Sequence, residues 1–510
     1  TDLNSTNETA GDRRIYLEAM VDYNRTFGRH DVNAMLLYNQ DELVNNVPGN
    51  NLINSLPKRK QGLAGRLSYA YDGKYMAEVN MGYNGSENFA KGHRWGFFPS
   101  IALGYNISEE SFFEPLRKVI TSMKLRGSWG LVGNDQIGGE RFIYMPTINL
   151  SGKGFTTGID QNYGLSGPVY TRYENNSITW EVGEKINLGI DLQLLNSLNI
   201  VVDIFRETRR DIFQKKGTIP TYLGTGNTDV FGNLAEMKNQ GLDLSIDYNK
   251  AFSKDFYMNF KGTFTYAHNE ITKYDEAPKY AFQSKVGQSA NVSQGYLSNG
   301  LFLDEAEIDR YNQQMGSTLG AGDIKYLNVS NMHGYGDDFV DVDDWTGIGN
   351  PTVPEIVYGF GPSFKYKNWD FSFFFQGVAK TSLFMSGFHP FGDNSLRNVL
   401  QFVANDRWSP TNQNVDAKYP RLTRKTSLNN TNPGNSGRTS DYWMRDGSFL
   451  KLKNMELGYT FKRMRFYISG SNLLTFSKFD LWDPEQGGGS GLKYPTQRVF
   501  NVGFQMTFNN

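Results

Sequence analysis

Acidic residues gather in one short stretch of the sequence that could bind a cation. The stretch contains Asp337, Asp338, Asp341, Asp343 and Asp344. Calcium takes about six to eight oxygen ligands, and a twelve-residue loop can supply them from regularly spaced positions. A frame that starts at His333 places Asp337 at position 5, Asp341 at position 9 and Asp344 at position 12. These three residues are the candidate ligands of a structural calcium ion. Because the other ligand positions and the usual glycine do not match, a solvated acidic loop is the favoured interpretation.

Other residue types that support catalysis form no recognisable site in the sequence. No two histidines have the spacing of a metal-binding pair, and their positions are 30, 93, 268, 333 and 389. The absence of cysteine excludes thiol catalysis. Gly224–Asn227 is rich in glycine but precedes no helix, which predicts a turn. Glu181 and Glu184 are imaginable as a glycosidase pair, but carboxylates are ordinary on polar strand faces. We therefore predict no enzyme, no catalytic residues and no cofactor beyond that calcium ion.

Aromatic residues in the long connections are candidates for ligand contacts. An oligosaccharide site usually combines aromatic faces with a few convergent hydrogen bonds. The aromatic and histidine side chains in or beside these connections are Trp345, Trp408, Tyr442, Trp443 and His389. The competing interpretation places most of them in the interior of the loops or at a membrane boundary. No single residue is therefore assigned to substrate binding.

The elements that would position such residues are strands with one aromatic face. Residues 356–366 and 369–379 alternate aromatic side chains with polar or small ones. Successive side chains of a strand point to opposite faces, so one face is apolar and the other polar. Recurrence of this pattern along a long chain favours a closed barrel in lipid, with an apolar outside and a polar lumen. We expect an all-β fold: a transmembrane antiparallel β-barrel.

Composition agrees with a barrel and argues against two other classes of protein. The 510 residues carry a formal net charge of −1, which gives no electrostatic reason to expect nucleic-acid binding. Mean hydropathy is −0.53, and no long apolar stretch predicts a helical membrane span. Aromatic residues make up 14% of the chain and glycines number 54, which suits strands with aromatic ends and many tight turns.

The strand pattern extends over residues 1–510 and predicts about fifteen strands. The candidates beyond 356–379 include 15–24, 32–40, 95–108, 122–133, 186–196, 199–214, 235–250, 255–271, 445–461, 463–479 and 498–508. Short turns alternate with long connections at 134–180, 272–355 and 380–442, the asymmetry expected of periplasmic turns and extracellular loops. The glycine run 487–491 predicts a flexible loop tip. Bacterial barrels have even strand numbers, so other strands must complete this one.

Short motifs along the whole chain resemble one family of outer-membrane proteins, the SusC/RagA-type TonB-dependent transporters. Each motif is weak alone, but their shared order is specific. They are Tyr71-Asp72-Gly73-Lys74-Tyr75, Asn84-Gly85-Ser86-Glu87-Asn88-Phe89, Phe98-Pro99-Ser100, Lys124-Leu125-Arg126-Gly127-Ser128-Trp129-Gly130, Trp180-Glu181, Asn187-Leu188-Gly189-Ile190-Asp191, Asn239-Gln240-Gly241-Leu242-Asp243, Gly349-Asn350-Pro351 and the terminal strand 498–508.

The resemblance implies a 22-stranded barrel in the outer membrane, with a plug and a surface lipoprotein of the SusD type. It implies TonB-dependent uptake of oligosaccharides, or of oligopeptides as in RagA, and assembly as a dimer of transporter–lipoprotein pairs. On this reading residues 1–510 are the C-terminal part of the barrel. The N-terminal plug, the TonB-binding segment and the first strands would then lie outside this sequence. Two alternatives stay open: a passive porin, and a β-rich adhesin or carbohydrate-binding protein outside the membrane.

Overall fold

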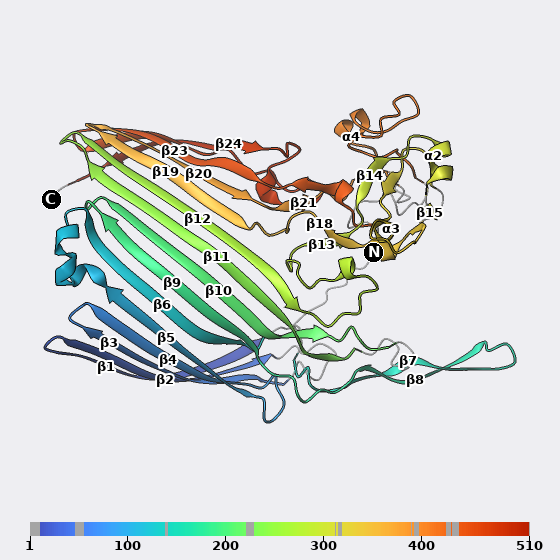
Figure 1. Ribbon diagram of the computed structural model, residues 1–510, viewed down its shortest axis with the longest axis horizontal. Coiled ribbons are helices and arrows are strands. Elements are labelled where there is room, and N and C mark those ends of the chain that lie inside the picture. The colour runs from blue at the N-terminus through green and yellow to red at the C-terminus, as the bar shows by residue number, and fades with distance from the viewer. Residues whose placement is uncertain are drawn as a thin grey trace, which may run out of the picture. The chain divides into compact units, whose positions relative to one another are not determined.

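The computed structural model describes residues 11–45, 56–137, 141–220, 229–311, 313–314, 319–388, 390–391, 397–424, 430 and 438–508. Within these residues, no helix is both long and apolar enough to cross a membrane. Most of the described chain is strand (Figure 1).

Fifteen strands form one sheet in which neighbours follow the order of the chain. The pairings within β1–β9 and within β12–β25 are antiparallel. The strands of the sheet are β1 (Asp12–Phe27), β2 (His30–Asn45), β3 (Lys58–Tyr71), β4 (Tyr75–Ser86), β5 (Trp95–Asn106), β6 (Ile120–Asn134), β9 (Glu181–Leu194), β10 (Leu198–Lys215), β11 (Phe231–Ala251), β12 (Phe256–Lys273), β19 (Ile356–Tyr366), β20 (Trp369–Ala379), β23 (Phe449–Phe461), β24 (Met464–Ser477) and β25 (Val499–Met506).

Shorter elements occupy the connections between these strands. The paired strands are β7 (Thr147–Thr157) with β8 (Tyr163–Arg172), β13 (Ser293–Gly295) with β18 (Thr346–Ile348), β14 (Ser298–Leu301) with β16 (Ile324–Tyr326), β15 (Gln313–Gln314) with β17 (Phe339–Val340), and β21 (Ser382–Phe384) with β22 (Met444–Asp446). The helices are η1 (Ile107–Glu109), η2 (Ser111–Leu116), η4 (Ala281–Gln283), α2 (Glu305–Arg310), α3 (Val329–Met332), η5 (Val342–Asp344), α4 (Gln401–Asn405), η6 (Asp441–Trp443) and η7 (Pro484–Gln486).

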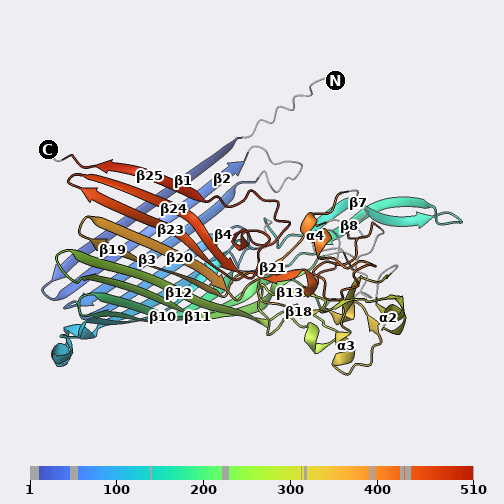
Figure 2. The same ribbon diagram turned by 90° about the horizontal axis from the view of Figure 1, so that it is seen from above.

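The chain divides into two compact units. The first comprises the described parts of Thr1–Asn196, Val201–Gln240 and Ile271–Ala277. The second comprises those of Ser197–Ile200, Gly241–Glu270 and Pro278–Asn510. In each unit, short turns make most of the connections at one end of the strands, and the long connections lie at the other (Figures 1 and 2). The predicted asymmetry between turns and loops is therefore present in both units.

Side chains of the first unit alternate between an apolar and a polar face. Along β4 and β5, the apolar pair Val79 and Ile101 lies opposite one another, and both side chains are exposed. On the other face Asn80 donates a hydrogen bond of 2.9 Å to Glu78. Large exposed apolar side chains on regularly alternating positions are what a sheet presents to lipid rather than to water.

The second unit contains the aromatic face predicted for residues 356–379. Phe360 lies opposite Phe375, with ring centroids 5.5 Å apart, and Phe364 lies opposite Phe371. Cross-strand aromatic pairs of this kind stabilise a sheet. Phe374 lies on the inner face, where its ring occupies the space that a side chain at Gly359 would need. The small residues of the inner face thus make room for one large ring.

Two expectations require correction, one about a predicted strand and one about the long connections. The predicted strand 445–461 is two elements, β22 and β23, because Gly447 and Ser448 interrupt it. The long connections also have structure of their own. The hairpin β7–β8 lies within 134–180, and the connections 272–355 and 380–442 contribute to a hydrophobic core in the second unit. Neither change alters the all-β class.

A charged residue should destabilise the protein more on the aromatic face of β20 than on its polar face. We expect Phe375→Arg, on the aromatic face about 20 Å along the strand from its first residue, to destabilise the folded protein by about 2–4 kcal/mol in lipid vesicles. Gln376→Arg, one residue further on the polar face, should change stability by no more than about 0.5 kcal/mol. Urea unfolding in vesicles measures both. Equal destabilisation by the two variants would contradict the assignment of the faces.

Candidate functional site

The polar face of the first unit carries networks of paired charges. Arg66 contacts Glu78 at 2.7 Å, while Arg126 contacts both Asp191 at 2.8 Å and Asp203 at 3.1 Å. Arg66, Glu78 and Arg126 line an open recess of about 500 Å³. The strands position these groups by register, because each lies on the face opposite the exposed apolar side chains. The arrangement supplies polar groups that are held in place and could contact a hydrophilic ligand or a second polypeptide.

The polar face of the second unit has a comparable network. Arg465 on β24 contacts Glu456 at 2.6 Å and pairs with Asp370 on β20. Three strands are thus linked through one guanidinium group. Near it, a smaller recess of about 380 Å³ is lined by Asn259, Phe374 and other inner-face residues.

The long connections of the second unit fold around a hydrophobic core of their own, called here the loop core. It consists of Tyr296, Leu301, Ile324, Tyr326, Val340, Leu383, Met385, Phe388, Phe391, Val403, Trp408, Ala417, Tyr419, Trp443 and Phe479. Burial raises the pKa of the Tyr419 hydroxyl to about 12, so this group stays neutral at physiological pH. A core of this size gives the loops a defined shape, as a binding surface requires.

A buried charge network holds the loop core together. Asp323 is fully buried, and its carboxylate pairs with Arg421 and accepts a hydrogen bond from Asn430. The backbone N–H of Gly320 donates a further bond of 2.9 Å to it. A buried charge is tolerated only when paired and hydrogen-bonded in this way. Segments far apart in the sequence are therefore joined through one carboxylate.

Most of the aromatic residues predicted as candidate ligand contacts belong to this loop core. Trp443 is fully buried and Trp408 is 5% exposed, while Tyr442 packs against the core and donates a bond of 2.8 Å to the carbonyl of Ala417. The interpretation as loop interior is confirmed for these three. Trp345 is exposed and meets Tyr296 edge to face. His389 and the turn Gly224–Asn227 lie outside the described residues.

The glycine run 487–491 was expected to be a flexible tip, and this expectation is wrong. The N–H of Gly489 donates a bond of 2.8 Å to the carbonyl of Phe384, and the indole of Trp482 donates one of 2.9 Å to that of Gly487. A Cβ at Gly488 would lie 2.7 Å from the carbonyl oxygen of Phe384. Only glycine permits this close approach of two backbones. The run is thus a packed part of the loops.

The packed glycine run forms one wall of a recess of about 700 Å³ in the second unit. Its lining combines aromatic rings with hydroxyl, amide and carboxylate groups, and includes Gln376, Phe384, Ser386, Phe449 and Glu485. This volume and mixture are typical of a small-molecule site. Sequence analysis missed this recess, because it depends on contacts between the glycine run and β21.

Beside this recess, one lysine anchors the loop that carries η7. Lys451 is 1% exposed; its ammonium group contacts Glu485 at 2.8 Å and pairs with Asp483. Burial alone raises the pKa of both carboxyl groups, but it is outweighed by the hydrogen bonds from Lys451 together with those from the Glu485 N–H to Asp483 and from Lys453 to Glu485, so both pKa values lie below their usual range. Lys453 makes a second contact with Glu485 at 2.7 Å. The pairing holds the recess wall against β23.

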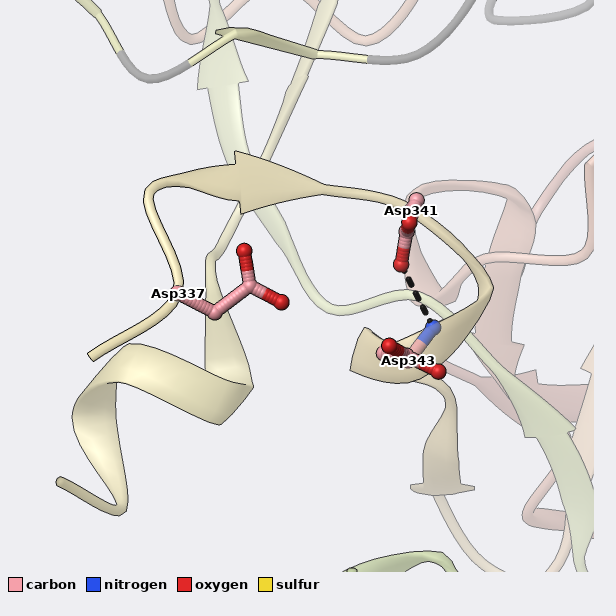
Figure 3. A group of neighbouring side chains, drawn as sticks. All are labelled: Asp337, Asp341 and Asp343. Atoms are coloured by element: carbon pink, nitrogen blue, oxygen red, sulfur yellow. Dashed lines mark hydrogen bonds between the residues drawn. The ribbon is translucent and has the colours of Figure 1, made fainter. Parts of the chain in front are cut away.

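The acidic stretch brings together a slightly different set of residues from the predicted one. Carboxylate oxygens of Asp337, Asp341 and Asp343 lie within 4.8 Å of one another (Figure 3). The buried carboxylate of Asp344 instead accepts bonds of 2.9 Å from the backbone N–H groups of Ser330 and Asp341. Asp344 thus supports the loop from inside. Asp343 also pairs with Lys279, and the hydrogen bond from Asp343 raises the pKa of this lysine.

The two glutamates considered as a catalytic pair do not converge. Their positions differ by three, so their side chains leave β9 on opposite faces. Glu181 accepts a bond of 2.9 Å from Asn134, whereas Glu184 accepts bonds of 2.9 Å from Trp129 and Arg210. Both carboxylates serve structural contacts, and the geometry gives no support to hydrolysis by this pair.

The depressed carboxyl pKa values near Lys451 predict a pH dependence of loop order. Stability from a depressed pKa is present above the unfolded value of about 4 and is lost as pH falls through the folded value. We therefore expect residues 479–491 to lose protection from hydrogen exchange below about pH 4. Lys451→Met should reduce protection already at pH 7, because removing one partner of a buried pair costs about 3–5 kcal/mol.

Lys453→Met is the matched control for that experiment. This lysine is more exposed, and its ion pair within the described residues is with Glu485, so its loss should cost less than about 1 kcal/mol. Hydrogen exchange is measured for the unaltered chain and for both variants, and the rates are corrected for the intrinsic dependence of exchange on pH. Protection that is independent of pH in the unaltered chain would contradict the role of this pairing.

Comparison with known proteins assigns this geometry to a family. A family model described as TonB dependent receptor-like, beta-barrel, matches residues 1–473. TonB-dependent receptor SusC of Bacteroides thetaiotaomicron is 28% identical over 483 residues, which cover 87% of this chain and 43% of the relative. TonB-dependent receptor P3 of Formosa agariphila is 26% identical over 481 residues, covering 87% of this chain and 45% of the relative.

A solved structure shares the fold. The structure of the RagAB peptide transporter matches with a TM-score of 0.71 at 20% identity, over 98% of this chain and 56% of that chain. The chain spans about half the length of the curated relatives it matches. The expected resemblance to SusC/RagA-type transporters and the expected all-β class are confirmed. The chain belongs to the TonB-dependent receptor-like β-barrel family.

Proposed function

We propose that this chain forms part of the wall of a SusC-type importer that takes up oligosaccharides across the outer membrane. The observation that carries the proposal is the match to SusC over 87% of the chain. Uptake would be driven through TonB, and a SusD-like surface lipoprotein would cover the long connections. By the same resemblance, two transporter–lipoprotein pairs would assemble as a dimer. The chain itself acts as a transporter component and not as an enzyme.

The structure supports this proposal through the properties of the two sheet faces and of the loops. Paired charges such as Arg126 with Asp191 keep the inner face polar while partly neutralising its charges. The loop core gives the ligand-facing loops a fixed shape. The recess of about 700 Å³ is lined by the half-buried Phe384 and the largely buried Phe449 beside residues with hydroxyl and amide groups. Sugars are bound by this combination of stacking faces and hydrogen bonds.

Peptide import is the second candidate function. Its support is the fold shared with the RagAB peptide transporter. A peptide would use the same recess differently, by pairing its backbone N–H and C=O groups with the polar lining. The two candidates therefore predict different co-purified ligands in the same protein.

The decisive experiment identifies the partner proteins and ligands that co-purify with the native protein. We expect extraction of the complete transporter in mild detergent, followed by native mass spectrometry, to show a lipoprotein partner and ligands with masses of sugar oligomers. Peptide masses would transfer the assignment to a RagA-type importer. A folded chain without partner or ligand that conducts ions in planar bilayers would contradict import and favour a passive porin.

Variants of residues in the second unit test whether the ligand binds in the recess of about 700 Å³. Phe384→Ala should lower affinity for the identified oligosaccharide about tenfold, because an aromatic contact is worth about 0.5–1.5 kcal/mol beyond its area. Phe371→Ala, on the apolar face, is the matched control and should leave affinity unchanged. Titration calorimetry with the purified complex measures both. Equal affinities in the two variants would place the ligand elsewhere.

We also propose that any cation held by the acidic stretch is a structural calcium ion. Asp337 and Asp341 belong both to the predicted ligand set and to the convergent group, and Asp343 adds a third carboxylate. Because Lys279 already balances Asp343, such an ion would be weakly held. Elemental analysis of the purified protein should show about one calcium per chain if the site is occupied. A stoichiometry near zero in millimolar calcium would remove the proposal.

A further inference from the structure

One connection at the short-turn end of the first unit differs from the others. Residues 107–119, called here the interfacial loop, join β5 to β6 through the helices η1 and η2 (Figure 1). The other described turns at this end of the strands, such as Gly28–Arg29 and 72–74, have two to four residues. A connection of thirteen residues is not needed to reverse a strand, so its extra length serves another purpose.

The interfacial loop is ordered by specific contacts. Phe113 is 3% exposed, and Arg117 donates a bond of 2.8 Å to the carbonyl of Ser108. The N–H of Leu195 in the adjacent turn donates a bond of 2.9 Å to the carbonyl of Val119. The loop therefore has a fixed position beside β5, β6 and β9.

Its position is on the apolar face of the sheet. Glu110 accepts a bond of 2.6 Å from the hydroxyl of Tyr75 and one of 3.4 Å from that of Tyr105. The two tyrosine rings stack with centroids 5.1 Å apart. Both tyrosines share a face with the exposed apolar residues of β4 and β5, including Leu103. Glu110 thus fastens the loop to the side of the sheet that faces lipid.

The depth of the loop follows from the aromatic residues at both ends of this apolar face. Tyr83 and Trp95 stack at 4.8 Å near the long connections, as Tyr75 and Tyr105 do near the turns. Eight residues separate Tyr75 from Tyr83, which corresponds to about 26 Å along the strand. With a tilt of about 40° this corresponds to about 20 Å along the membrane normal, somewhat less than the apolar band of about 25 Å between aromatic girdles. The Tyr75–Tyr105 pair then lies at a membrane boundary, and Glu110 places the loop there.

The exposed surface of the loop fits such a boundary. Phe112, Leu116 and Val119 are 67%, 51% and 56% exposed. Arg117 and Lys118 stand among these apolar residues and are exposed, as are Glu109 and Glu114, and Arg117 lies 4.0 Å from Glu109. Apolar side chains beside basic ones are the pattern of segments that lie in the headgroup region of a bilayer.

We propose that the interfacial loop is a membrane anchor that inserts Phe112 and Leu116 into the phospholipid leaflet at the short-turn end of the strands, with Arg117 and Lys118 at the headgroup phosphates. The occupant is a lipid surface because Glu110 holds the loop against the apolar face of β4 and β5 at the aromatic pair Tyr75–Tyr105. The inference goes beyond transport, since it concerns how the barrel is held at a fixed depth in the membrane.

The experiment uses fluorescence in a membrane. The 510 residues contain no cysteine, so a single thiol can be placed at will, with any cysteine outside this sequence replaced by serine. The complete transporter carries the environment-sensitive dye NBD at Phe112→Cys and is reconstituted in phospholipid vesicles. Leu103→Cys on β5 is the control within the bilayer. Met332→Cys on α3, 68% exposed, is the control in water.

We expect NBD at position 112 to emit at shorter wavelength than at 332 and to be quenched at least twofold more by nitroxide-labelled phospholipids. Shallow nitroxides should quench it more than deep ones, the reverse of the order at 103. A label at 112 that behaves like the one at 332 would overturn the anchor while the membrane-facing assignment of β5 stands, and would favour contact with a periplasmic protein. Absence of quenching at 103 as well would overturn the anchor and the membrane-facing assignment together.

Discussion

Alternation of side chains along the strands is the constraint on which the rest of this chain depends. Lipid offers no hydrogen-bond partner, so a sheet in a membrane satisfies its backbone groups only between neighbouring strands. Each strand then has one face for lipid and one for the polar interior. In β4 and β5 this gives Val79 and Ile101 on one side and Glu78 on the other. In β20 it places the neighbouring residues Phe375 and Gln376 on opposite faces.

The polar face imposes a second requirement, which is that its charges be paired. Arg126 joins Asp191 and Asp203 across β6, β9 and β10, and Arg465 joins Asp370 and Glu456 across β20, β23 and β24. Each guanidinium links more than one strand through its several donors. Such networks link neighbouring strands while leaving the inner face hydrophilic.

The long connections must keep a defined shape without lipid around them and without the regular strand pairing of the sheet. They do so with the loop core and with the buried carboxylate of Asp323. Lys451 adds a link between this region and strand β23. At the short-turn end of the first unit, the interfacial loop uses Glu110 and two tyrosines to lie against the apolar face. The interfacial loop, like the long connections, therefore has a structure of its own rather than being a simple turn.

The sequence by itself determined the strands, their two faces and the family resemblance. A period of two is a local property, so the aromatic positions of 356–379 could be predicted from neighbouring residues alone, and the strand predicted at 95–108 differs from β5 only in its end at Asn106. Only the tertiary structure decided that the glycine run 487–491 packs under Phe384, and that Asp343 rather than Asp344 joins Asp337 and Asp341. It likewise decided that Trp408 and Trp443 are interior. These outcomes depend on contacts between segments far apart in the chain, and no local pattern of residue types specifies which distant backbone will approach.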